Sequence, residues 1–269
     1  MATKYNHGPI GPWGSPLDFV TSKNDKLGIY VAETTQRFML GAKVMTWDGR
    51  LFKYALAKGT LNADLLAKSY ATQNLAFATV GAGDGRAAGD TDIKVPFGAA
   101  DGYANSGLVV EDELAGGYVV IFSDTVVTMN RGIVGNTGIA SAGDVVIYLD
   151  APLNAAVAPA TSFVEAMGSP YYDVRNDSDG SKTCVGLPVV EATTGQYCFL
   201  QTYGPTWVAP QSGVGATTLI RAVYARHDGS LDIRSGVGTN VTDQRVGYVL
   251  QNAQAGTQGA PFVQLQISI

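Results

Sequence analysis

Short apolar runs separated by glycine and aspartate limit most strongly what this chain can fold into. The clearest run is FVQLQISI (residues 262–269), in which Val263, Leu265, Ile267 and Ile269 alternate with Gln and Ser. Alternation with a period of two places these apolar side chains on one face of a β-strand. Because an unpaired strand edge promotes aggregation, we expect the strand to pair in a sheet or with a neighbouring subunit. Leu265 and Ile267 are therefore candidate interface residues.

Two Asp-Gly pairs predict tight β-hairpins. Asp48-Gly49 divides AKVMTWDGRLFKYALAKG (residues 42–59), and Asp228-Gly229 divides TTLIRAVYARHDGSLDIRSG (residues 217–236). The Asp-Gly pair favours two-residue hairpin turns, in which glycine supplies a positive φ at little cost. Trp47 falls on one arm of the first hairpin and is a further candidate interface residue.

The composition and the remaining runs indicate an all-β fold. Glycine accounts for 33 of the 269 residues, which is well above average usage. GGYVVIFSD (residues 116–124) and GDVVIYLDAPL (residues 143–153) are apolar almost throughout, a pattern that predicts strands covered on both faces. Many short strands with glycine-rich turns predict a β-sandwich or a barrel-like domain of short antiparallel strands.

We expect three parts along the chain. Residues 1–40 are predicted to form an extended N-terminal arm, because HGPIGPWGSP is rich in Pro and Gly. Residues 41–75 are predicted to hold the first hairpin and a short helix over residues 60–70, where leucines recur at helical spacing. Residues 76–269 are expected to form the β-rich main domain. Trp13 in the arm is a candidate interface anchor, since large aromatic side chains are favoured at interfaces.

An aromatic stretch, QYCFLQTYGPTWVAP (residues 196–210), admits two interpretations. Both faces of its first half are largely apolar, which favours a buried strand that ends at Gly204-Pro205. Trp207 lies just past that break and is predicted to contact a partner. The alternative is an aromatic ligand site.

Charge and missing motifs argue against several classes of function. The net charge is −5 and the 18 basic residues are scattered, so nothing predicts binding to nucleic acid. No apolar run approaches the length of a membrane span, and the N-terminus has no signal-peptide pattern. Neither His7 nor His227 is predicted to be held as a general base, because one lies in the arm and the other in an exposed turn. Phosphate-binding, zinc-protease and serine-nucleophile motifs are also missing, so we expect no enzyme activity and no cofactor.

An acidic loop and the two cysteines could bind a metal ion or have only a structural role. DVRNDSDGSK (residues 173–182) resembles half of a calcium loop through Asp177 and Asp179, but Gly186 stands where a bidentate Glu is needed. A solvated turn is favoured and a weak calcium site stays open; otherwise no metal is expected. Cys184 and Cys198 match no disulfide or zinc pattern, so buried free thiols in a reducing cytosol are expected.

The order of several motifs resembles the head decoration (cement) proteins of tailed bacteriophages and related virion proteins. The motifs are GGYVVIF, GNTGIASAGDVVIYLDAPL, SPYYDV, GLPVVEATTGQYCFLQTYGPTWV and VGYVLQ, and WDGRLFKYALAKGTLNADLLAKS is similar to the segment before the β domain in such proteins. The likeness extends over most of residues 38–251 and has no catalytic signature.

The resemblance implies a protein of the capsid surface, made in the host cytoplasm. It would bind the major capsid protein of the assembled shell as a homo-oligomer, with a trimer favoured over a dimer. Residues 1–40 are expected to clasp a neighbouring subunit or the shell. The alternative is a tail, fibre or head-fibre protein that binds a receptor or a glycan through Tyr171, Tyr172 and Tyr203.

Overall fold

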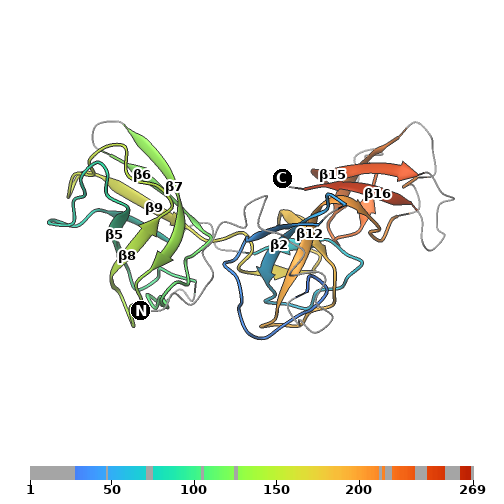
Figure 1. The fold of residues 1–269 in the computed structure, drawn as a ribbon, viewed down its shortest axis with the longest axis horizontal. Helices are drawn as coiled ribbons and strands as arrows, with labels where there is room; N and C mark the ends of the chain where they lie inside the picture. The colour runs from blue at the N-terminus through green and yellow to red at the C-terminus, as the bar shows by residue number, and fades with distance from the viewer. Residues whose placement is uncertain are drawn as a thin grey trace. The chain divides into compact units, whose positions relative to one another are not determined.

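The structure, a computed structural model, describes residues 28–46, 48–70, 75–103, 106–123, 127–211, 214–215, 220–233, 241–251 and 261–267. Every helix or strand in these ranges is a β-strand, so the predicted all-β fold is confirmed. None of the described ranges contains a helix long and apolar enough to cross a membrane. The chain divides into two compact units (Figure 1), of which unit 1 comprises Met1–Tyr70 and Pro170–Ile269, and unit 2 comprises Ala71–Ser169.

Unit 1 is built on a ten-stranded antiparallel sheet (Figure 1). The strand order is β10-β3-β11-β12-β16-β15-β13-β14, with β2 also paired to β12 and β1 paired to β2. The strands are β1 (Lys43–Met45), β2 (Leu51–Leu56), β3 (Ala67–Ser69), β10 (Val174–Arg175), β11 (Cys184–Pro188), β12 (Tyr197–Thr206), β13 (Ala222–Arg226), β14 (Leu231–Asp232), β15 (Val241–Gln251) and β16 (Phe262–Gln266).

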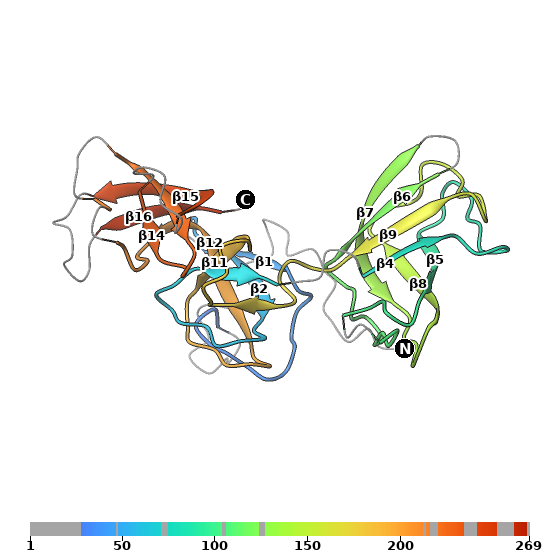
Figure 2. The same ribbon diagram turned by 180° about the vertical axis from the view of Figure 1, so that it is seen from behind.

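Unit 2 is a six-stranded antiparallel sheet in the order β4-β9-β6-β7-β8-β5, which curls around its own apolar core (Figure 2). The two strands at the ends of this order, β4 and β5, also lie against each other. The strands are β4 (Ala76–Thr79), β5 (Asp92–Phe97), β6 (Tyr118–Phe122), β7 (Thr128–Asn136), β8 (Gly143–Leu149) and β9 (Phe163–Met167). The unit is therefore barrel-like, with one face of each strand turned inward.

Both predicted Asp-Gly hairpins are confirmed. Between β1 and β2, Gly49 has a φ of +83° and donates its N–H to the carbonyl of Thr46. Between β13 and β14, Gly229 has a φ of +85° and donates its N–H to the carbonyl of Arg226. A side chain at either glycine would strain the backbone, which explains why glycine stands at both positions.

The pairing expected for the last strand is also confirmed. β16 lies between β12 and β15 and is antiparallel to both. Val263 and Leu265 are fully buried in a core cluster of unit 1, and Ile267 packs against that cluster. Ile269, predicted to share this face, lies outside the described residues.

The prediction of a short helix over residues 60–70 is wrong. The segment forms a turn, in which Leu65 donates its N–H to the carbonyl of Asn62, and then strand β3. Asn176 satisfies the backbone of this turn, since its Oδ1 accepts from the N–H of Asn62 and its Nδ2 donates to the carbonyls of Leu65 and Leu66. A helix of this length has little stability of its own. Hydrogen bonds to distant segments therefore decide the conformation.

The expected division of the chain is also corrected. Residues 41–75 do not form a separate part of the chain, because β2 pairs with β12. The described part of the expected arm packs in unit 1, where Ile29, Phe38 and Leu40 belong to a core cluster. The expected domain of residues 76–269 is split, since residues 71–169 form unit 2.

The prediction that residues 116–124 and 143–153 form strands covered on both faces is wrong. In β6, Tyr118 is 55% exposed and Phe122 is 39% exposed, whereas Val119 and Ile121 are fully buried. Tyr148 in β8 is likewise exposed. The same prediction for residues 196–210 is confirmed over the first half of β12, where five consecutive residues from Cys198 are buried. The predicted end of the strand at Gly204-Pro205 is wrong, because both residues pair with β16.

Candidate functional site: an uncovered aromatic face

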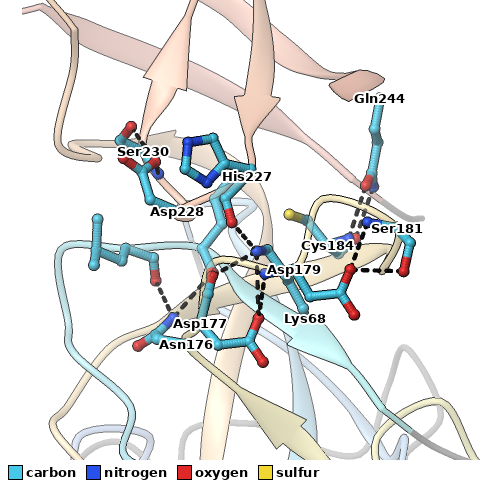
Figure 3. Close-up of polar contacts among 12 residues, drawn as sticks. Lys68, Asn176, Asp177, Asp179, Ser181, Cys184, His227, Asp228, Ser230 and Gln244 are labelled. Carbon is cyan, nitrogen blue, oxygen red and sulfur yellow. Dashed lines mark hydrogen bonds and ion pairs between the residues drawn. The ribbon is translucent and has the colours of Figure 1, made fainter. Parts of the chain in front are cut away.

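A buried lysine ties three segments of unit 1 together (Figure 3). Lys68 lies on β3, and 0% of its side-chain surface is exposed. Its ammonium group donates to the carbonyl of Asp177 at 2.6 Å and to the carbonyl of His227, and lies 3.5 Å from Asp177 Oδ1. A buried ammonium group is tolerated only when its donors find acceptors. These contacts therefore hold the loop at Asp177 and the β13–β14 hairpin against β3.

The two carboxylates predicted as possible calcium ligands are engaged within their own loop (Figure 3). Asp177 Oδ1 accepts from the N–H of Asp179 at 3.0 Å, and Asp179 Oδ1 accepts from the N–H and the hydroxyl of Ser181. The hydrogen bonds from Ser181 lower the pKa of the Asp179 carboxyl group. Nowhere in the described ranges are three or more His, Cys, Asp or Glu side chains grouped to hold a metal ion. The calcium alternative thus finds no ligand set here, and Lys68 supplies the positive charge beside this loop.

The turn that carries His227 is packed against the same centre, which corrects the expectation of an exposed turn. His227 and Asp228 are both half-buried. The Asp228 carboxylate accepts from the N–H and the hydroxyl of Ser230 and pairs with Arg226 at 2.9 Å. Burial raises the pKa of Asp228, but the bonds from Ser230 and the charge of Arg226 outweigh it, so the pKa is lowered. The carboxylate of Asp228 is therefore fully engaged within the turn, whereas Nε of Arg226 is buried without a hydrogen-bond partner among the described residues.

The two cysteines are buried and free, as predicted. Burial raises the pKa of each thiol to about 12. The backbone of Cys184 exchanges two hydrogen bonds with the side chain of Gln244 (Figure 3), both of 2.7 Å. A thiol with so high a pKa is a poor nucleophile and a poor metal ligand at neutral pH, so both cysteines have a packing role.

The predicted interface residues differ in how far their own chain buries them. Trp13 and Trp47 lie outside the described residues. Leu265 is fully buried by its own chain, so its assignment to a subunit interface is corrected to a core role. Ile267 is half-buried beside the same core. Trp207 is half-buried, and its Nε1 is shielded from solvent with no hydrogen-bond partner among the described residues.

The aromatic residues at the start of β12 pack against one another. Tyr54 stacks on Tyr197 with ring centroids 5.7 Å apart, lies 5.1 Å from Phe199 and meets Phe38 edge-on at 5.2 Å. Burial raises the pKa of Tyr54, whose hydroxyl accepts from the N–H of Arg37. The rings leave an open depression beside them. Their mutual packing favours the core interpretation of this stretch over a ligand site.

The tyrosines proposed for glycan binding are mostly covered. Tyr171 is only 8% exposed and belongs to the same core cluster, which corrects its assignment to an exposed site. Tyr172 and Tyr203 are half-buried.

Unit 2 has exposed aromatic side chains on three neighbouring strands, β4, β9 and β6. Figure 2 shows these strands beside β7 in the curled sheet. Phe77 on β4 is 56% exposed, Phe163 on β9 is 42% exposed, and Phe122 and Tyr118 on β6 are also exposed. The rings of Phe77 and Phe163 are stacked, with centroids 5.9 Å apart and planes 11° from parallel. No described segment of unit 2 covers these rings. We call this surface, on β4, β9, β6 and β7, the aromatic face.

The strand register arranges the aromatic face in three rows across the sheet. Phe163 and Phe122 lie opposite each other at the centre of one row, and Glu165 and Val120 at the centre of the next. Glu165 is the one charged residue in these rows. From one side of the sheet to the other the rows are Thr79–Phe163–Phe122–Thr128, Phe77–Glu165–Val120–Asn130 and Met167–Tyr118–Gly132.

The other two strands of the same sheet carry charged pairs beside the exposed Tyr148 on β8. Lys94 on β5 pairs with Asp84 at 2.9 Å and with Asp144 on β8 at 2.8 Å. Asp92 on β5 pairs with Arg86. Charged pairs of this kind are typical of a surface that stays in water, whereas the aromatic face lacks them.

Sequence reasoning missed the aromatic face, although one signal for it was present. Tyr118, Val120 and Phe122 recur at a period of two and therefore share one face of a strand. Because residues 116–124 are apolar almost throughout, the sequence predicted a strand buried on both faces and not one exposed face.

Comparison with known proteins adds no relative: no family model matches the chain, and neither curated proteins nor solved structures yield a significant match.

Proposed function

We propose that the protein is a structural virion protein that binds the outside of an assembled bacteriophage capsid and stabilises the shell. Its partner is the major capsid protein, and it acts as a homo-oligomer, with a trimer favoured. The motif order of the sequence supports the class of protein. The low charged fraction of 15% and the predicted lack of catalytic motifs fit a protein that works by binding.

The aromatic face of unit 2 is the observation that carries this proposal. Contiguous exposed apolar patches on a folded protein commonly mark interaction sites. Covering the exposed parts of Phe77, Phe122 and Phe163 lowers the free energy, each by a part of the roughly 1.5–3 kcal/mol that full burial of such a side chain contributes. A partner that covers them therefore stabilises the complex without any charged contact.

A tail or fibre protein is the second candidate. Exposed aromatic rings on a sheet also stack on sugar rings, and the aromatic face offers such rings where Tyr171 does not. The two candidates differ in where the protein sits on the particle and in what it binds.

Imaging of particles that carry the protein, compared with particles that lack it, tests the proposal directly. We expect additional density on the outer surface of the shell, and a higher melting temperature for shells to which the protein is bound. Density confined to the tail would favour the second candidate. Empty shells that fail to bind the purified protein would contradict the proposal.

A further inference from the structure

We propose that the aromatic face is the surface by which unit 2 docks on the capsid shell. Its partner is a protein surface with little charge that the shell presents in many copies. This inference rests on the proposed function and adds the docking surface and the chemistry of the partner to it.

The distribution of charge within unit 2 is the first argument. Glu165 is the one charged residue in the three rows of the aromatic face. Lys94, Asp92 and Asp144 lie on the neighbouring strands and are engaged in ion pairs. The centres of protein interfaces are depleted in charge and enriched in aromatic residues and Met. The composition of the aromatic face therefore fits a protein partner with little charge of its own.

The polar residues at the edges of the rows are the second argument. Thr79, Thr128 and Asn130 are exposed, and their side chains make no hydrogen bond to the rest of the described chain. Glu165, at the centre of the middle row, has no ion-pair partner in the described ranges, so a partner that covers it has to offer a hydrogen-bond donor. Interfaces typically surround an apolar centre with polar groups that bond across to the partner. The three side chains at the row edges are available for that purpose.

The size of the aromatic face decides between one partner copy and many. Four strands about 4.8 Å apart, with outward residues about 6.8 Å apart along each strand, give a face of roughly 20 by 20 Å, or about 400 Å² in projection. A stable one-to-one complex buries about 800 Å² on each partner. A single aromatic face is therefore a small docking surface for a one-to-one complex. A shell that repeats the same site lets an oligomer engage several sites at once, which raises the apparent affinity without larger contacts.

The experiment compares binding of full-length variants to empty capsids of the phage that encodes the chain. In the test variant, Phe77→Ser and Phe163→Ser are combined, which removes the stacked pair. Its matched control is Phe262→Ser on β16 of unit 1, where a phenylalanine is 41% exposed, nearly the same as Phe163 at 42%. Thermal unfolding followed by circular dichroism checks that each variant folds, and sedimentation gives the oligomeric state.

The double variant is expected to bind capsids roughly tenfold to a hundredfold more weakly, as for truncated interface anchors. Phe262→Ser should bind as the unmodified chain does. Added salt should change the affinity little, because the face carries almost no charge.

Four results would overturn the inference. If the unmodified chain does not bind capsids, the proposed function itself fails. Equal capsid binding by the unmodified chain and a folded double variant would leave the function standing and remove the docking surface. A change of oligomeric state in the double variant, with capsid binding per oligomer retained, would assign the face to self-association. Loss of glycan binding with capsid binding retained would assign it to a sugar.

Discussion

Two strands with similar sequences, β12 and β6, have different surroundings. β12 begins YCFLQ and β6 reads YVVIF, and both runs predict strands covered on both faces. β12 is covered because Phe38, from the segment before β1, lies against Tyr54 and Phe199. β6 is covered only on its inner face, and Tyr118 and Phe122 on its outer face stay exposed.

The contrast shows that an apolar strand face can be covered by its own chain or left for another molecule to cover. An apolar strand face gains free energy by leaving water whichever surface covers it. In unit 1 the chain supplies that surface itself, with a segment that carries Ile29, Phe38 and Leu40. In unit 2 the described chain supplies none for the aromatic face, so the same sequence pattern marks a core in one unit and a docking surface in the other.

The largest expected effect comes from a truncation on β12. Phe199→Ala should lower the free energy of unfolding by about 4 kcal/mol, because Phe199 is only 4% exposed and the change leaves a cavity among aromatic rings. The matched change on β6, Phe122→Ala, should cost less than about 1 kcal/mol, since that ring is partly in water already. Urea unfolding of both variants measures the difference. Equal losses would contradict the view that only β12 is covered by its own chain.

The buried lysine of unit 1 should have the next largest effect. Lys68→Met keeps the length of the side chain but leaves the carbonyls of Asp177 and His227 without their donor. The loss of stability should be about 2–3 kcal/mol. The control is Lys94→Met in unit 2, which breaks two ion pairs of a half-buried lysine near the surface and should cost far less. Thermal unfolding of the two variants measures both losses of stability. A larger loss for Lys94→Met than for Lys68→Met would show that the buried centre contributes little to stability.

The smallest effect concerns Cys198 on β12 and appears only at high pH. Burial raises the pKa of this thiol from 9.0 to about 12. Above pH 9 the unfolded chain releases the thiol proton and the folded chain keeps it, so stability is fully present below pH 9 and falls as pH rises towards 12. By pH 10 the loss should reach about 1.4 kcal/mol for this thiol.

Unfolding measured at pH 8 and pH 10 checks this prediction. Cys198→Ala should show a smaller loss between the two pH values than the unmodified chain. An identical loss in both would mean that Cys198 is not shielded on β12. Alkylation of the native protein at pH 8 should also be slow at this thiol.

Local patterns in the sequence predicted the fold class and several of its elements. The Asp-Gly turns appear where the sequence places them, because positive φ at Gly49 and Gly229 is a property of the residue itself. The strand over residues 262–266 and the double-sided burial of β12 were also predicted, since side-chain direction follows from the period of a strand. The predicted polar face of the last strand is only partly exposed, because Gln264 is buried. These features depend on neighbours a few residues away.

The errors arose where distant segments decide the outcome. The leucines of residues 60–70 have helical spacing, yet Asn176 and β11 hold that segment as a turn and a strand. The division of the chain follows from β2 pairing with β12, across more than 140 residues. The aromatic face was invisible for the same reason. Whether Phe77, Phe122 and Phe163 are covered depends on which segments pack over the sheet, and a strand period carries no information about that packing.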